Sequence, residues 1–101
     1  MIRIEKGVDI CNISGPMLLA VQVLHTIYRE RYKNDLVITS GRDSHHRHVL
    51  HYVGCALDFR IRNLPPGDLA SLEGVCQSAL GEQYDCVLES DHLHVEFDPR
   101  A

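Results

Sequence analysis

The first third of the chain carries the hydrophobic pattern of a helix. The run Ser14-Gly15-Pro16 is typical of a helix start, with the proline at the first helical position. The apolar stripe that follows recurs at four-residue steps and consists of Leu19, Val23 and Ile27, with Ala20 and Leu24 beside them. This spacing predicts an amphipathic helix that continues to about Arg31 and ends near Asn34.

Two segments in the middle of the chain have the pattern of strands. The β-branched residues 36–39 predict a short strand, which Ser40-Gly41 ends. Residues 55–62 alternate between apolar and polar side chains, as in a strand with one buried face. The face expected to meet the core consists of Cys55, Leu57, Phe59 and Ile61. The opposite face consists of Ala56, Asp58, Arg60 and Arg62.

A second helix is predicted after this strand. Pro65-Pro66-Gly67 interrupts the alternation, and Asp68 is placed to cap the helix that follows. Its apolar stripe consists of Leu69, Leu72, Val75 or Cys76, and Ala79. Gly81 is the expected stop.

The end of the chain predicts two more strands, over residues 84–88 and 92–97. The last one alternates, with Leu93, Val95 and Phe97 against His92, His94 and Glu96. The tight connection at 89–91 predicts a hairpin. The order helix, strand, strand, helix, strand, strand predicts a small single α+β domain over residues 1–101. In this domain an antiparallel sheet carries two helices on one face and an open site on the other.

The composition fits a small globular domain and argues against several partners. The 101 residues include 10 basic and 14 acidic side chains, which gives a net charge of −4. Such a chain lacks the basic surface of a protein that binds nucleic acid or an anionic membrane. No apolar run approaches the roughly 20 residues of a membrane helix. The N-terminus shows no signal peptide, so we expect synthesis in the cytoplasm, and we expect a monomer.

The four cysteines are Cys11, Cys55, Cys76 and Cys86. No two of them stand at the spacing of zinc ligands. Without a secretion signal, reduced thiols that pack in the interior are the expected state.

Six of the seven histidines fall in two short windows, and the strand pattern brings parts of both windows together. Asp58 lies on the polar face of its strand, and His92 and His94 lie on the polar face of the last one. His51 stands seven residues before Asp58, with Gly54 between them to let the chain turn. A histidine, an aspartate and a histidine that converge on an open face can make a three-ligand zinc site. In such a site the fourth position stays open for water, as in catalytic centres.

The spacing alone leaves simpler interpretations open. A lone histidine on a strand is more often a surface residue than a ligand, and His25 is expected on a helix surface. Asp91, three residues before His94, is a candidate general base or a cap of the turn. Arg60 and Arg62 fit an ordinary solvated face. The loop histidines are His45, His46 and His48. They are most simply solvated; the alternatives are contact with substrate and adventitious binding of metal.

Three segments together resemble a family of zinc peptidases. They are I-T-S-G-R-D at 38–43, H-Y-V-G-C-A-L-D at 51–58 and E-S-D-H-L-H-V-E at 89–96. They are similar to the motifs S-x-H-x-x-G-x-A-x-D and D/E-x-x-H of the zinc D,D-carboxypeptidase and L-alanyl-D-glutamate peptidase family. These enzymes act on peptidoglycan and include phage endolysins. The resemblance covers about residues 36–97.

The resemblance implies a role for each matching residue. The implied zinc ligands are His51, Asp58 and His94. Asp91 matches the general base, and Arg42 matches the arginine that holds substrate or the developing oxyanion. His92 matches the first histidine of H-x-H, beside the ligands. The family's serine is replaced by Val49, so its hydroxyl is missing or supplied by Ser44.

The expected function is zinc-dependent hydrolysis of an amide bond in the peptide stem of bacterial peptidoglycan. The expected protein is a metallopeptidase of phage or prophage origin that acts on the cell wall after release or within a virion. The alternative is a non-catalytic metal-binding or peptide-binding domain, or a virion structural protein, on the same scaffold. The motifs leave the cleaved bond open, because pocket loops such as residues 41–50 determine it.

Overall fold

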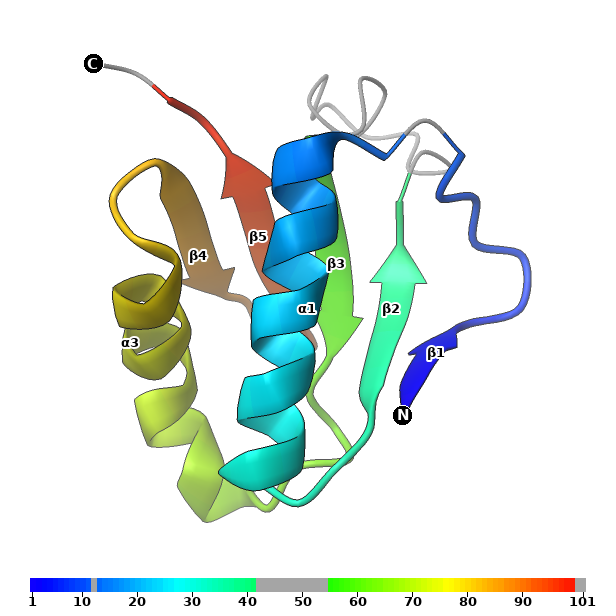
Figure 1. Cartoon of the computed structure of the whole chain (residues 1–101). Coiled ribbons are helices and arrows are strands. Elements are labelled where there is room, and N and C mark those ends of the chain that lie inside the picture. Colours follow the sequence, from blue (N-terminus) through cyan, green and yellow to red (C-terminus); the bar gives the residue numbers. More distant parts are fainter. Residues whose placement is uncertain (12, 42–54, 100–101) are drawn as a thin grey trace.

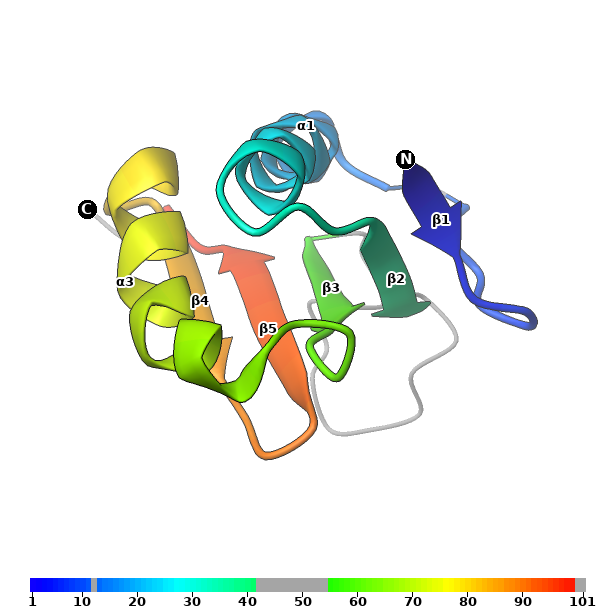
Figure 2. The ribbon, with the colours of Figure 1, turned by 90° about the horizontal axis from the view of Figure 1, so that it is seen from below.

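One sheet runs through the molecule, and both helices cover the same face of it (Figures 1 and 2). The computed structural model describes residues 1–11, 13–41 and 55–99. The strands of these residues, in spatial order, are β1 (Ile2–Ile4), β2 (Leu36–Ser40), β3 (Ala56–Arg60), β5 (His92–Phe97) and β4 (Tyr84–Leu88). The helices are α1 (Gly15–Glu30) and α3 (Leu69–Leu80), and a 3-10 turn over Pro66–Asp68 leads into α3. The α+β class is confirmed.

The sheet is mixed, which corrects the prediction of an antiparallel sheet. Neighbouring strands are antiparallel in the pairs β2 with β3, β3 with β5, and β5 with β4. The predicted hairpin of β4 and β5 is confirmed. β1, however, pairs with β2 in parallel. Along the chain, α1 connects β1 to β2. A connection through a helix returns the chain in its original direction, so the two strands can pair in parallel. Three residues are too few for β1 to show a recognisable alternation.

Helix α1 begins as predicted but buries a different face. The hydroxyl of Ser14 accepts a hydrogen bond from the backbone N–H of Met17 at 3.3 Å, which caps the helix. The buried positions are Met17, Ala20, Val21, Leu24 and Tyr28. Leu19, at the head of the predicted stripe, is 59% exposed. The prediction was therefore right for Ala20 and Leu24, partly right for Ile27, which is half-buried against the core, and wrong for Leu19.

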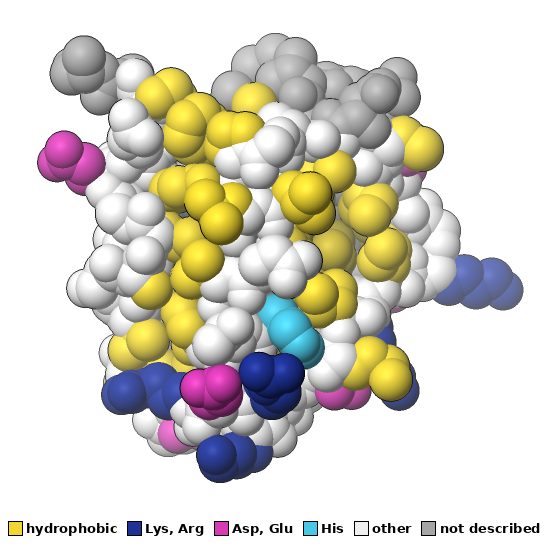
Figure 3. All heavy atoms as spheres, viewed as in Figure 1, with side chains coloured by type: hydrophobic (Ala, Val, Ile, Leu, Met, Phe, Trp, Pro, Cys, Tyr) yellow, Lys and Arg dark blue, Asp and Glu magenta, His cyan; other side chains and the backbone are white. Residues whose placement is uncertain are grey.

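The cause is the breadth of the apolar surface of α1. Leu18 and Leu19 are exposed, and apolar side chains are visible across this side of the molecule (Figure 3). A four-residue step can therefore be drawn along more than one face. Tyr28 decides the orientation, because its ring is buried and its hydroxyl donates a 3.1 Å hydrogen bond to the Arg60 carbonyl.

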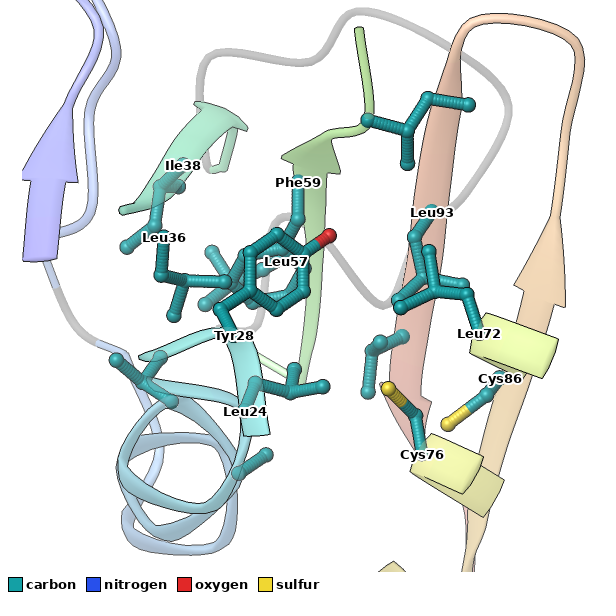
Figure 4. Packing of buried hydrophobic residues seen from close by; sticks show 14 of the residues in the cluster. Leu24, Tyr28, Leu36, Ile38, Leu57, Phe59, Leu72, Cys76, Cys86 and Leu93 are labelled. Atoms are coloured by element: carbon teal, nitrogen blue, oxygen red, sulfur yellow. The ribbon is translucent and has the colours of Figure 1, made fainter. Parts of the chain in front are cut away.

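Helix α3 packs on the other half of the same sheet face. Leu72 and Cys76 are buried as predicted, and they lie against Leu93 and Cys86 (Figure 4). Asp68 makes no capping hydrogen bond with its side chain, which corrects the predicted role. The chain already has helical backbone angles at this residue, because the 3-10 turn precedes it. The predicted stop is confirmed: Gly81 has a φ of 92°, which favours glycine.

The face of β3 and β5 that meets the helices is the predicted one, although Ala56, His94 and Glu96 on the other face are also buried. Leu57, Phe59, Leu93 and Val95 are buried against the helices, together with other residues of the core (Figure 4). By strand alternation the side chains between them lie on the opposite face. The two helices leave that face uncovered (Figure 2). The polar residues of both strands therefore share one side of the sheet.

The cysteines occupy three different environments. Cys76 and Cys86 are buried in the core, Cys55 is half-buried and Cys11 is exposed. The expected packing role is therefore wrong for Cys11, which lies in the connection between β1 and α1. Burial raises the pKa of the Cys76 and Cys86 thiols to about 12. No helix in the described part of the chain is long and apolar enough to span a membrane.

Candidate metal centre

The pairing of β3 with β5 brings two predicted zinc ligands together. In the antiparallel register Asp58 lies opposite His94, and both side chains are on the face without helices. His94 Nδ1 and Asp58 Oδ1 are 2.8 Å apart and form a hydrogen bond. The side chains are only 8% and 16% exposed, respectively. The contact is therefore part of the folded structure and not a chance encounter at the surface.

A third residue, Glu96, completes this buried cluster. His94 Nε2 and Glu96 Oε1 are 2.7 Å apart, and the Glu96 side chain is 9% exposed. Glu96 was not among the residues that the sequence predicted for the site. The alternation of β5 was the available signal, because it places His92, His94 and Glu96 on one face. We refer to Asp58, His94 and Glu96 as the buried cluster.

His94 lies between two acidic side chains, with one ring nitrogen in contact with each of them. An ionised carboxylate can only accept, so each contact favours a proton on the facing ring nitrogen. Burial lowers the pKa of His94, but the hydrogen bonds and negative charges of Asp58 and Glu96 outweigh burial and raise it above the ordinary value. The cluster therefore has a place for positive charge, and the charge is compensated from both sides of the ring.

A second aspartate–histidine pair lies at the start of the same strand. His92 Nδ1 and Asp91 Oδ1 are 2.7 Å apart, with side chains that are 30% and 85% exposed. The hydrogen bond with His92 lowers the pKa of Asp91, so this carboxylate is ionised at neutral pH. The other ring nitrogen of His92 is 3.7 Å from Asp58 Oδ1. His92 thus stands between Asp91 and the buried cluster, and we refer to Asp91 and His92 as the exposed pair.

The buried cluster has the chemistry of part of a zinc site. Zinc binds imidazole nitrogen and carboxylate oxygen at about 2.0–2.2 Å, so two such donors on a tetrahedral ion stand about 3.3 Å apart. The 2.8 Å between His94 Nδ1 and Asp58 Oδ1 would have to widen by only about half an ångström. Glu96 on the far ring nitrogen matches the carboxylate–histidine–zinc arrangement of known centres. The residues therefore fit zinc as two ligands and one supporting carboxylate.

The third predicted ligand cannot be placed. His51 and Arg42 lie outside the described residues, as do His45, His46 and His48. Within residues 1–11, 13–41 and 55–99 no group of three or more histidine, cysteine, aspartate or glutamate side chains is arranged to hold a metal ion. Of the predicted site residues, the structure brings together Asp58, His94, His92 and Asp91.

A cavity of about 570 Å³ opens beside these residues. Asp58, Asp91 and His92 form part of its wall, and Arg60 and Arg62 follow Asp58 along the chain. An apolar part of the wall comes from the connection between β3 and α3 and from the first residue of α3, and consists of Ile61, Leu64, Pro66 and Leu69. The remaining lining residues are Glu5, Thr39 and Ser90. The cavity therefore offers both polar and apolar surface next to the buried cluster.

Comparison of the chain with protein-family models and with curated proteins, and of its fold with solved structures, gave no match.

Proposed function

We propose that the protein is a zinc-dependent peptidase that hydrolyses an amide bond in the peptide stem of bacterial peptidoglycan. The observation that carries the proposal is the buried cluster. Its Asp58 and His94 belong to two different motifs of the zinc-peptidase resemblance, 36 residues apart, and lie 2.8 Å from each other. The resemblance also supports a metallopeptidase of phage or prophage origin, of the D,D-carboxypeptidase or L-alanyl-D-glutamate endopeptidase type.

Each residue has a chemical task in this proposal. His51, Asp58 and His94 would hold the ion, and Glu96 would orient the His94 ring. Zinc in this position supplies a Lewis acid for the scissile carbonyl and lowers the pKa of a water molecule to about 7. Arg42 would bind the substrate or the oxygen on which negative charge develops.

The exposed pair is suited to moving the proton. Asp91 is ionised at neutral pH, as an ordinary aspartate is, and it lies in the wall of the cavity where substrate would bind. It would accept the proton of the attacking water and deliver it to the leaving amine. His92 forms a 2.7 Å hydrogen bond with the carboxylate and stands between it and Asp58. Asp91 is one methylene shorter than glutamate and has to approach the water more closely.

Two measurements on the purified chain test the proposal. Elemental analysis is expected to find one zinc per chain in the wild type and little in His51→Ala and Asp58→Asn. His25→Ala, on helix α1 and away from the cluster, is the matched control and is expected to keep its zinc. Equal zinc contents in His51→Ala and the wild type would reject the ligand assignment.

The second measurement is mass spectrometry of stem peptides after digestion of purified peptidoglycan. The fragments are expected to name the cleaved bond, and their release is expected to stop in Asp58→Asn. Zinc binding without fragment release would favour the non-catalytic metal-binding or peptide-binding domain. The absence of both would overturn the zinc peptidase.

A further inference from the structure

Two arginines line the cavity beside the buried cluster, and the proposed chemistry uses neither of them. Arg60 lies opposite His92 in the pairing of β3 with β5, two residues after Asp58 and on the same face. Arg62 follows in the turn after β3 and is exposed. The sequence pattern alone is equally consistent with a solvated face. Both arginines, however, lie in the wall of a cavity next to Asp58, where they can contact a bound molecule.

The guanidinium group of Arg60 is incompletely satisfied. Its side chain is 25% exposed, and Nη2 donates a 2.9 Å hydrogen bond to Glu5 Oε2. The Nε–H group is buried and has no acceptor within the described residues. A buried donor without an acceptor is destabilising, and a charged one more so than a neutral one. An acceptor that reached this group after a shift of the Arg60 side chain would remove this cost.

The contact with Glu5 shows which chemistry suits the group. A guanidinium presents donors in a planar fork that matches the two oxygens of a carboxylate. Glu5 is itself a carboxylate, it also lines the cavity, and its side chain is 42% exposed. Within the described residues Arg62 forms no ion pair and adds a second positive charge to the same wall. Arg60 and Arg62 therefore form a basic part of a wall that also carries Asp58 and Asp91, and the exposed carboxylate of Glu5 already pairs with this basic part.

We propose that this cavity binds the carboxylate of a short peptide through Arg60, with Arg62 in support, in competition with Glu5. The inference rests on the proposed function in one respect: the peptide's amide bond would extend from Arg60 toward Asp58. These residues are two positions apart on β3, which is about 7 Å along a strand. One or two residues of an extended peptide span that distance. The cleaved bond would therefore lie close to a free carboxylate of the substrate.

Binding of two matched probes to the purified chain tests this inference. The probes are N-acetyl-D-alanine and the neutral N-acetyl-D-alaninamide, titrated while the Arg60 Nε–H resonance is followed by nuclear magnetic resonance. The acid is expected to shift this resonance and to bind about tenfold more tightly than the amide, since only the acid offers a charged acceptor. Equal binding of both probes would overturn the carboxylate site.

Three variants sharpen the test. Arg60→Gln is expected to abolish the preference for the acid, and Glu5→Gln is expected to strengthen acid binding several-fold because the internal competitor is gone. Arg3→Gln is the matched control, because Arg3 also pairs with an exposed carboxylate, that of Asp35 at 3.3 Å, but does not line the cavity. If Arg60→Gln fails to fold, Glu5→Gln still decides: unchanged or weaker acid binding in that variant contradicts the inference.

The outcome is independent of the peptidase assay. A chain that discriminates acid from amide but releases no stem fragments keeps the carboxylate site and loses the proposed peptidase. A chain that releases fragments but binds both probes equally keeps the peptidase and loses the carboxylate site.

Discussion

The molecule contains two aspartate–histidine contacts of nearly the same length in very different surroundings. In the buried cluster His94 and Asp58 are 2.8 Å apart, with side chains 8% and 16% exposed. In the exposed pair His92 and Asp91 are 2.7 Å apart, with side chains 30% and 85% exposed. By distance alone the two contacts would be expected to contribute equally to stability. Their different burial predicts different contributions.

The difference shows how one strand can supply both a fixed and an adjustable group. Water cannot replace a lost partner in the buried cluster, so Asp58, His94 and Glu96 hold one another in one geometry. Water can replace either partner of the exposed pair, so that contact adds little to stability and leaves Asp91 accessible to substrate. A metal ligand needs the first environment, and a proton acceptor needs the second.

Replacement of His94 is expected to have the largest effect on stability and tests the buried side of this comparison. In His94→Ala the side chains of Asp58 and Glu96 lose the imidazole ring that lies between them. Breaking a buried charged contact typically costs about 3–5 kcal/mol, so we expect a loss of this size in the free energy of unfolding. Urea denaturation in the presence of a chelator measures it without a contribution from metal. Zinc binding is expected to be lost as well.

His92→Ala is the matched control for this experiment, because it removes the same ring from the same face of β5. Its unfolding curve is expected to stay close to that of the wild type. Similar destabilisation in both variants would show that burial does not distinguish the two contacts.

Replacement of Asp91 tests the other half of the comparison. Asp91→Asn keeps the shape of the side chain and an oxygen that can cap the turn, but it cannot accept a proton. Loss of a general base typically slows a reaction by a factor of about 10² to 10⁴. We therefore expect stem-peptide release to slow at least about a hundredfold, with zinc content and melting temperature close to wild type. Rates of amine release at equal zinc occupancy provide the measurement.

A turn-capping role for Asp91 predicts the opposite result. Hydrolysis by Asp91→Asn would then stay within a few-fold of wild type. That result would reject the proposed proton acceptor even if the metal site is correct.

Local pattern was sufficient to predict most of the fold. The alternation in residues 55–62 and 92–97 predicted which face of β3 and β5 is buried, because a strand's side chains alternate regardless of its neighbours. Strand β1 was missed because three residues carry no period. The buried face of α1 was misassigned because apolar residues surround much of that helix, and a long-range contact of Tyr28 selects the orientation.

The candidate site was predicted in part for the same reasons. The shared face of Asp58, His92 and His94 followed from alternation, whereas the exact register that sets Asp58 opposite His94 did not. Glu96 was overlooked because a carboxylate on a polar strand face is ordinarily a solvated residue. Only its 9% exposure and its contact with the ring distinguish it from such a residue.

Replacement of Glu96 gives the smallest expected effect and tests whether the third member of the buried cluster belongs to the metal site. Glu96→Gln keeps an oxygen that can accept from His94 Nε2, so the ring orientation is expected to survive, but the negative charge that makes the ring a better ligand is lost. Supporting residues of this kind typically change metal affinity by a factor of about 10 to 100, and retention of the hydrogen bond places Glu96→Gln near the lower value. Competition for zinc with a chromophoric chelator measures the affinity without reference to hydrolysis.

Asp85→Asn is the control, because Asp85 lies opposite Glu96 in the pairing of β4 with β5 and is exposed. A similar loss of affinity in both variants would assign the effect to general charge on this face of the sheet, and an unchanged affinity in Glu96→Gln would remove Glu96 from the metal site.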